Sequence, residues 1–141
     1  MPNPRYTLAP RFAPGFRLSL LDVIILVVGA VAAVVVGRSD WLLGANIGFV
    51  VFHFFLFCNV FRISRTLELT WAAAFLCLAA GLFGEAISLV VAVSLSLLCT
   101  LIVIAIETTK PSYHGIWWRR INPGLPNWWE ANQRPAPSSA I

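Results

Sequence analysis

Long runs of apolar residues fill the middle of the chain and are separated by very short polar breaks. Each run is close to the roughly 20 helical residues that cross the about 30 Å hydrocarbon core of a bilayer. The pattern predicts an all-α integral membrane protein. Its four transmembrane helices are expected at residues 18–37, 42–61, 67–83 and 85–107.

The third run, residues 67–83, is at the short end of the spanning range, so three crossings compete with four. Four crossings place nine of the 10 Lys and Arg residues on one side and leave Arg38 alone on the other. Three crossings divide them five to five. Because basic residues accumulate in cytoplasmic loops, we expect four crossings with both termini in the cytoplasm.

A proline-rich stretch with three arginines precedes the first apolar run. The apolar part of a signal peptide is about 7 to 15 residues long, shorter than residues 18–37, so we interpret that run as a retained helix. Val35 and Gly37 would nevertheless suit a signal peptidase. The expected parts are a cytoplasmic arm (1–17), a four-helix membrane domain (18–107) and a cytoplasmic tail (108–141), in a bacterial cytoplasmic membrane.

Composition supports the membrane assignment. Of the 141 residues, 59% are hydrophobic and 11% charged, and the mean hydropathy is +0.81, outside the range of ordinary soluble domains. The net charge of +4 does not indicate nucleic-acid binding, because the basic residues flank apolar runs instead of alternating with aromatic residues on a polar face. The three cysteines lie inside apolar runs, without metal-ligand spacing, and are expected to pack as small apolar residues.

Small residues recur at four-residue spacing in every run. Helices in lipid associate through close backbone approach, which such stripes allow. We expect most stripes to pack within the chain and at least one to serve a partner chain. The stripes are Gly29, Ala33 and Gly37; Gly44 and Gly48; Ala73, Cys77 and Gly81; and Ser88, Ala92, Ser96 and Thr100.

His53 is the only ionisable residue well inside an apolar run, and such residues suggest function by default. It follows Asn46 by two helical turns, so both are expected to face the protein interior. Three roles stay open: a hydrogen-bonded packing residue, which is the leading interpretation, a ligand of haem or (bacterio)chlorophyll, and proton transfer. Haem with two ligands from one chain is disfavoured, because the only other histidine and methionine are His114 and Met1.

The acidic residues lie near the ends of the runs. Capping and the helix dipole predict first-turn positions for Asp22, Glu68 and Glu85. Asp22 or Glu107 is also expected to pair with an arginine of the 62–66 loop. Ion-coupled transporters carry carboxylates near the bilayer midplane, and this chain has none there.

No catalytic motif is present: there is no phosphate-binding glycine loop, no nucleophile elbow and no HExxH. We therefore expect the protein not to be an enzyme. The second run has a dense aromatic surface that suits packing, lipid contact, or contact with ring-bearing cofactors, quinones or helices of another subunit. Its phenylalanines are Phe49, Phe52, Phe54, Phe55, Phe57 and Phe61.

The tail is rich in Pro and Trp and has no sustained apolar period, which predicts irregular structure. Indole rings and cations suit the lipid headgroup region, so the tail is expected to lie at the membrane interface. Clustered Trp and Arg also form binding hot spots, so a docking arm for a partner subunit is the alternative. The residues concerned are Trp117, Trp118, Arg119, Arg120, Trp128 and Trp129.

The very short loops and the absence of catalytic motifs in the sequence favour a small non-catalytic accessory or assembly subunit of a larger membrane complex. Energy-transducing complexes are among the candidates. Its expected partners are membrane lipids and helices of other membrane subunits. One alternative is a small oligomeric transporter or channel with a polar path along the Ser88, Ser96 and Thr100 face. A further alternative is a haem- or pigment-binding membrane protein that uses His53.

Overall fold

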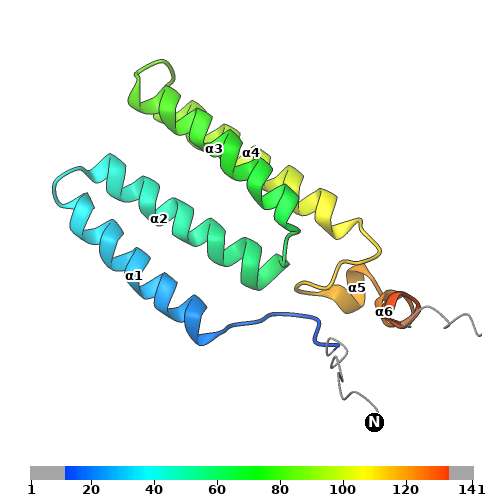
Figure 1. The fold of residues 1–141 in the computed structure, drawn as a ribbon. Coiled ribbons are helices and arrows are strands. Elements are labelled where there is room, and N and C mark those ends of the chain that lie inside the picture. The colour runs from blue at the N-terminus through cyan, green and yellow to red at the C-terminus, as the bar shows by residue number, and fades with distance from the viewer. Residues whose placement is uncertain (1–11, 134–141) are drawn as a thin grey trace, which may run out of the picture.

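The computed structural model of the chain describes residues 12–133, so the predicted roles of Arg5, Arg11 and Arg134 lie outside the described residues. The described part is helical and contains no strand (Figure 1). A short π-helical segment, η1, continues the second helix. The elements are α1 (Leu20–Gly37), α2 (Trp41–Phe55), η1 (Leu56–Phe61), α3 (Arg65–Phe83), α4 (Leu89–Thr108), α5 (Trp118–Ile121) and α6 (Leu125–Gln133).

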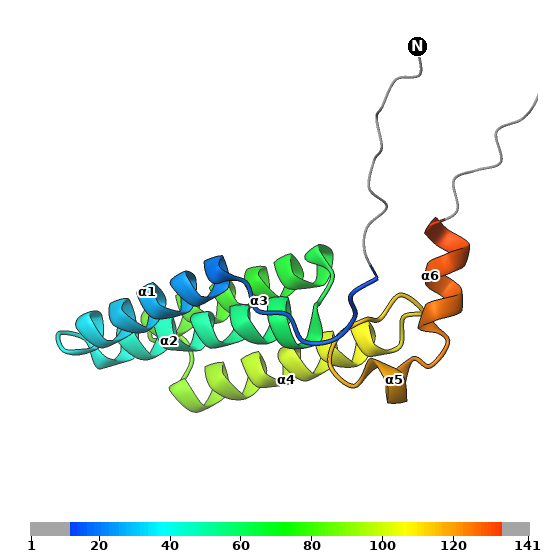
Figure 2. The ribbon, with the colours of Figure 1, turned by 90° about the horizontal axis from the view of Figure 1, so that it is seen from below.

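Two antiparallel hairpins, α1 with α2 and α3 with α4, lie side by side (Figures 1 and 2). By length and composition, four helices of the described chain could cross a membrane: α1, α2 together with η1, α3, and α4. The prediction of four long apolar helices is confirmed. The third is a continuous helix of 19 residues, and at about 1.5 Å per residue it is long enough to span the hydrocarbon core.

Local capping sets where α1 and α2 begin. Asp22 lies in the first turn of α1, as predicted, and forms a capping box with Ser19: the Asp22 N–H donates to Ser19 Oγ (3.2 Å) and the Ser19 N–H donates to Asp22 Oδ2 (2.7 Å). Asp40 caps α2 by accepting from the Leu43 N–H (3.0 Å). Glu68 lies in the first turn of α3, as predicted. Short polar side chains thus satisfy backbone N–H groups where α1 and α2 begin.

The fourth helix begins later than predicted, at Leu89 instead of residue 85. The prediction that Glu85 occupies a first helical turn is wrong, because Glu85 lies in the preceding turn with a left-handed φ of +58°. The N–H groups of Ala86 and Ile87 both donate to the Gly81 carbonyl (2.8 and 3.2 Å). These residues therefore cap the end of α3 and cannot belong to α4.

The π-helical turn of η1 was not expected. It shifts the register at the end of the second span, and both Phe57 and Asn59 become 2% exposed. Arg62 then takes a left-handed φ of +53°, and the Ile63 N–H donates to the Phe57 carbonyl (2.8 Å). The spacing of apolar residues does not distinguish an i→i+5 turn from an ordinary helical turn. The π-helical turn could therefore not be predicted from that spacing.

The tail contains two short helices, so the prediction of irregular structure is wrong over α5 and α6. Pro126 lies in the first turn of α6, where a missing backbone N–H costs nothing. Leu125 is completely buried. The Asn122 side chain ties the tail together by donating to the carbonyls of Pro111 (2.6 Å) and Tyr113 (3.2 Å).

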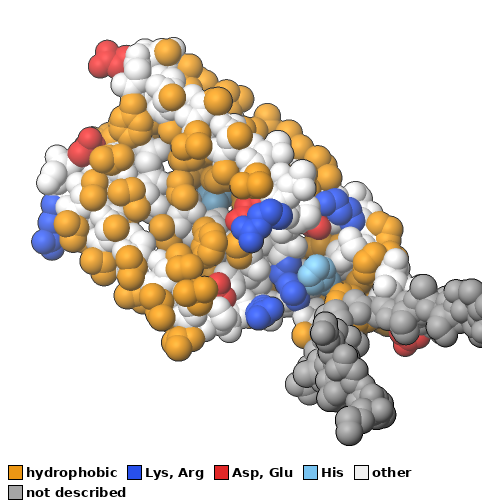
Figure 3. Space-filling view, viewed as in Figure 1, with side chains coloured by type: hydrophobic (Ala, Val, Ile, Leu, Met, Phe, Trp, Pro, Cys, Tyr) orange, Lys and Arg blue, Asp and Glu red, His pale blue; other side chains and the backbone are white. Residues whose placement is uncertain are grey.

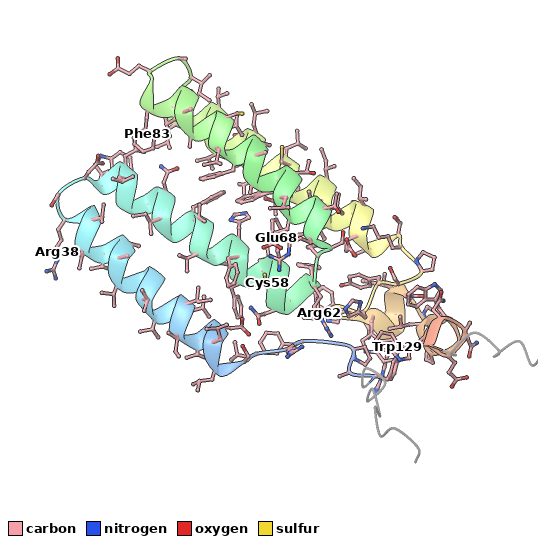
Figure 4. All side chains as sticks on the ribbon, viewed as in Figure 1. Arg38, Cys58, Arg62, Glu68, Phe83 and Trp129 are labelled. Atoms are coloured by element: carbon pink, nitrogen blue, oxygen red, sulfur yellow. The ribbon has the colours of Figure 1, made fainter. Side chains whose placement is uncertain are left out.

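The segment before α1, the 62–64 loop and the tail lie at one end of the bundle, and the 38–40 and 84–88 turns lie at the other (Figure 1). Arg38 is at the opposite end from Arg62 (Figure 4). Lysine and arginine side chains gather towards the tail end on the face seen in Figure 3. The described basic residues of that end are Arg17, Arg62, Arg65, Lys110, Arg119 and Arg120.

The core lies between the two hairpins, towards the end that carries the tail. Its buried centre consists of Phe57, Ile63, Trp71 and Val103. Within the described chain, no residue of α1 is buried, and this helix packs mainly on α2. The outer surface of the four long helices is apolar (Figure 3).

Candidate functional site

The small residues of α1 and α2 face one another within the chain. A Cβ on Gly44 would overlap the Gly37 backbone and come within 2.6 Å of the Ala33 carbonyl oxygen, so the two backbones are in direct contact. A Cβ on Gly29 would meet the Val51 side chain at 2.5 Å, and one on Gly48 would lie 3.7 Å from the Ala33 Cβ. The first two stripes therefore hold the first hairpin together.

The stripe on α4 also faces inward. Ala92, Ser96 and Thr100 are 3–5% exposed, while Ser88 is exposed and caps the helix by accepting from the Val91 N–H (3.4 Å). The sequence spacing placed these residues on one face, and the structure turns most of that face towards α3.

The small residues of α3 point outward instead. Ala73 and Cys77 are exposed, and only Gly81 is turned towards the chain, against Ile87. Exposed small residues recur along this helix at three- and four-residue spacing, which places them on one face. This outward face of α3 consists of Thr66, Thr70, Ala73, Cys77 and Ala80.

His53 is completely buried among aromatic rings. Its ring stacks on Trp71 (centroids 4.6 Å apart, 15° between planes) and lies 4.1 Å from the Phe49 ring. His53 Nδ1 is 2.8 Å from the Phe49 carbonyl oxygen, so that nitrogen carries the proton. Nε2 has no hydrogen-bond partner among the described residues. Asn46 lies on the same helix, where its amide donates to the Leu42 carbonyl (2.9 Å).

Trp71 joins three helices. Its Nε1–H donates to Thr100 Oγ1 (2.9 Å), and that hydroxyl donates to the Ser96 carbonyl (2.8 Å). The Phe75 ring stacks on the indole at 5.2 Å, and the Phe57 ring meets it edge-on at the same distance. Trp71 was not among the functional residues predicted from the sequence. A tryptophan inside an apolar run was nevertheless a usable signal, because a buried indole N–H needs an acceptor.

A cavity of about 100 Å³ lies between α2, α3 and α4, beside Asn46, Phe75 and Ser96. His53 is not among the described residues that line it. Small-molecule sites usually enclose about 300–1,000 Å³. Among the described residues, the surroundings of His53 thus offer aromatic packing and a local hydrogen bond.

Glu107 is 4% exposed and connects the end of α4 to the start of α3. It accepts from the Ser64 N–H (3.1 Å), the Ser64 hydroxyl (2.8 Å) and Lys110 Nζ (2.8 Å). The expected pairing of Glu107 with an arginine of the 62–66 loop is wrong. Lys110 is its partner, because it lies one turn further along the chain, whereas Arg65 pairs with Glu68 at 3.7 Å.

Asp22 does not pair with an arginine of that loop either. Its carboxylate accepts from Ser19, and it also accepts from the buried Asn59 amide (2.9 Å) when that amide is oriented with its nitrogen towards the acceptors. In the same orientation Asn59 donates to the Arg17 carbonyl (2.5 Å). The burial of Asn59 therefore depends on the segment that precedes α1.

The segment before α1 and the tail both dock on the end of η1. The Ile116 N–H donates to the Val60 carbonyl (2.8 Å), and the Gly15 N–H donates to the His114 carbonyl (2.8 Å). A Cβ on Gly115 would overlap the Phe61 carbonyl. Segments far apart in the sequence thus meet through backbone contacts.

Tyr113 anchors the tail at the point where it leaves α4. It is 1% exposed, and its hydroxyl donates to the Ile116 carbonyl (2.8 Å). Burial, with a smaller effect from the Glu107 charge, raises the pKa of Tyr113 to about 12. The phenol is therefore held neutral as a structural donor.

The predicted interface residues of the tail divide into two sets. Trp118 and Trp129 each meet the Phe12 ring edge-on (5.9 and 5.5 Å), and Arg119 lies 5.6 Å from the Trp118 ring. Trp117 is 66% exposed. Arg119 and Arg120 are also exposed, and Trp128 is half-buried. Two indoles therefore fix the tail to the segment before α1, while the others lie at the surface.

No known protein family, curated protein or solved structure matches the chain. Its described residues also contain no group of three or more His, Cys, Asp or Glu side chains that could hold a metal ion.

Proposed function

We propose that the chain is an integral membrane protein that crosses a bacterial cytoplasmic membrane four times, with both termini in the cytoplasm. Four long apolar helices support this proposal. The described basic residues cluster at the end that carries the tail, and Arg38 lies at the other end. Such a bias is typical of the cytoplasmic side.

Cysteine labelling tests this topology in a background in which Cys58, Cys77 and Cys99 are replaced by alanine. The variants Ser39→Cys and Ala86→Cys are expected to react with an impermeant maleimide in intact cells. Thr109→Cys is expected to react only after the membrane is opened. All three positions are exposed. Equal labelling of Ala86→Cys and Thr109→Cys from one side would contradict four crossings.

We further propose that the protein is a small non-catalytic subunit that binds a transmembrane helix of a larger membrane complex. The observation that carries this proposal is the outward face of α3. Its small residues are exposed, and Leu69 (62% exposed) and Leu76 (67% exposed) stand beside them. The other three stripes are largely engaged within the chain, so this face is the one on which a second backbone could approach closely.

Purification of the tagged protein from its native membrane in mild detergent, followed by mass spectrometry, tests this function. The wild type is expected to carry a stoichiometric membrane partner. Ala73→Phe, which fills the outward face of α3, should lose that partner. Leu101→Phe is the matched control, because Leu101 is 65% exposed on α4, outside this face. Recovery of the wild-type chain alone would overturn the proposal.

The contacts of the other candidate residues favour packing over the two alternatives. A polar path would need the hydroxyls of Ser96 and Thr100, but both residues are buried and the Thr100 hydroxyl is bonded to Trp71 and to the Ser96 carbonyl. Pigment binding would need open space against His53, where aromatic rings pack instead.

A further inference from the structure

A cleft of about 550 Å³ opens where the segment before α1 meets the tail. Its walls combine basic side chains from three separate parts of the chain with aromatic rings. Figure 4 shows two of the lining residues, Arg62 and Trp129, at this end of the bundle. The lining includes Arg17, Arg62 and His114 on the polar side and Phe12, Phe16 and Trp129 on the apolar side.

Neither arginine of this cleft forms an ion pair with a carboxylate of the described residues, and Arg17 acts on the Asp22 carboxylate only at longer range. Within residues 12–133 the ion pairs are Arg65 with Glu68 and Lys110 with Glu107, so Arg17 and Arg62 have no such partner there. Burial, and then the positive charge of Arg17, lower the pKa of Arg62. Two like charges at one partly buried place destabilise each other, and a bound anion would remove that repulsion.

Backbone contacts hold the walls of the cleft in place. The Arg62 side chain donates to the Ala13 carbonyl through Nη1 (2.7 Å), and its other guanidinium donors have no hydrogen-bond acceptor among residues 12–133. The Arg17 N–H donates to the Asn59 carbonyl (3.2 Å). His114 Nδ1 lies 2.8 Å from the Ser112 carbonyl oxygen, which orients the ring. A site that is ordered before binding loses less entropy when its ligand arrives.

We propose that this cleft binds a phosphate group, with the guanidinium groups of Arg17 and Arg62 as its charged donors. A guanidinium group presents paired N–H donors that match two phosphate oxygens. The volume lies within the about 300–1,000 Å³ of small-ligand sites. The aromatic walls suit the glycerol backbone and the upper acyl chains of a phospholipid. A soluble phosphate compound carries the same phosphate group and is the alternative ligand.

The test uses the full-length protein purified in detergent and measures the affinity for three probes. These are phosphatidylglycerol, diacylglycerol with the same acyl chains but no phosphate, and inorganic phosphate. Phosphatidylglycerol is expected to bind and diacylglycerol is not. If inorganic phosphate binds as tightly as phosphatidylglycerol, the ligand is a soluble phosphate. If inorganic phosphate binds much more weakly than phosphatidylglycerol, the ligand is the lipid.

Arg17→Gln is expected to weaken phosphatidylglycerol binding about tenfold or more, which corresponds to the loss of one charge-assisted hydrogen bond. The substitution spares the backbone contact to Asn59, so the fold is retained. Arg65→Gln is the matched control, because Arg65 lies at the same end of the bundle but outside the cleft. The affinity of this variant for phosphatidylglycerol should stay within about twofold of the wild-type value. Equal binding of diacylglycerol, or wild-type affinity in Arg17→Gln, would overturn the proposal.

Discussion

The indole nitrogen of Trp71 donates a 2.9 Å hydrogen bond to the hydroxyl oxygen of Thr100, which connects α3 to α4 between two apolar surfaces. The same indole stacks on His53 of α2. One side chain therefore links the two hairpins at the place where their interface is most buried. Polar contacts of this kind are few inside a helical membrane domain and help to fix its packing.

Thr100→Val tests this link. The substitution keeps the shape of the side chain but leaves the buried indole N–H without its acceptor, so we expect the free energy of unfolding to fall by about 1–2 kcal/mol. Unfolding in mixed detergent micelles, followed by circular dichroism, measures it. Thr70→Val is the control, because the exposed Thr70 hydroxyl donates to the Thr66 carbonyl of its own helix and to no other described residue. Equal effects of the two variants would contradict a role for the Trp71 bond.

Gly44→Ala should disrupt the first hairpin. The added methyl group would overlap the Gly37 backbone, which cannot rotate away as a side chain can, so we expect a loss of about 1–3 kcal/mol in unfolding free energy. Gly48→Ala is the matched control on the same helix, where the methyl group meets Ala33 Cβ at an ordinary 3.7 Å. A thermal melt of both purified variants compares them. A Gly44→Ala protein as stable as Gly48→Ala would show that α1 and α2 do not touch here.

Lys110→Met should destabilise the junction between α4 and the 62–64 loop. The Glu107 carboxylate is 5% exposed and would lose its charged partner, so we expect unfolding to become easier by about 1–3 kcal/mol. Arg65→Met removes a longer pair, in which the arginine side chain is 82% exposed, and should cost at most about 1 kcal/mol. Chemical denaturation in detergent measures the free energy of unfolding of both variants. A larger loss in Arg65→Met than in Lys110→Met would contradict a stabilising role for the buried pair of Lys110 and Glu107.

Tyr113 should ionise only near pH 12. Because the pKa in the folded state is about 12 and the ordinary value is 10.0, the unfolded chain releases this proton first as the pH rises. Stability is therefore retained below pH 10 and falls between pH 10 and 12, by about 2–3 kcal/mol in total. The phenolate difference spectrum between wild type and Tyr113→Phe gives the midpoint. A midpoint near pH 10 would show that the phenol is exposed to solvent.

Much of the architecture could be read from the sequence, because the relevant signals are local. The length of an apolar run decides whether its helix can cross a bilayer, and the Ser19 and Asp22 side chains cap α1 from three residues apart. The start of α4 was misplaced because the residues around Glu85 are used to finish α3, and apolar patterning cannot distinguish a long C-terminal cap from a first turn. The helices of the tail were missed because a short helix leaves little periodicity.

The candidate sites were harder to predict. Spacing placed small residues on one face of each helix, but the helix that each face meets depends on how the hairpins assemble. That assembly turned Ala73 and Cys77 outward and Ser96 and Thr100 inward. In the sequence Arg17 and Arg62 are separate flanking charges. The contact of the segment before α1 with η1 brings both to one cleft.

The sequence by itself therefore determined the number and apolar character of the long helices, because these follow from each segment's own composition. The tertiary structure alone decided the partners of those helices. It paired Trp71 with Thr100 across 29 positions and Arg62 with the Ala13 carbonyl across 49. Such pairings depend on the relative rotation and register of packed helices, which side-chain periodicity leaves open.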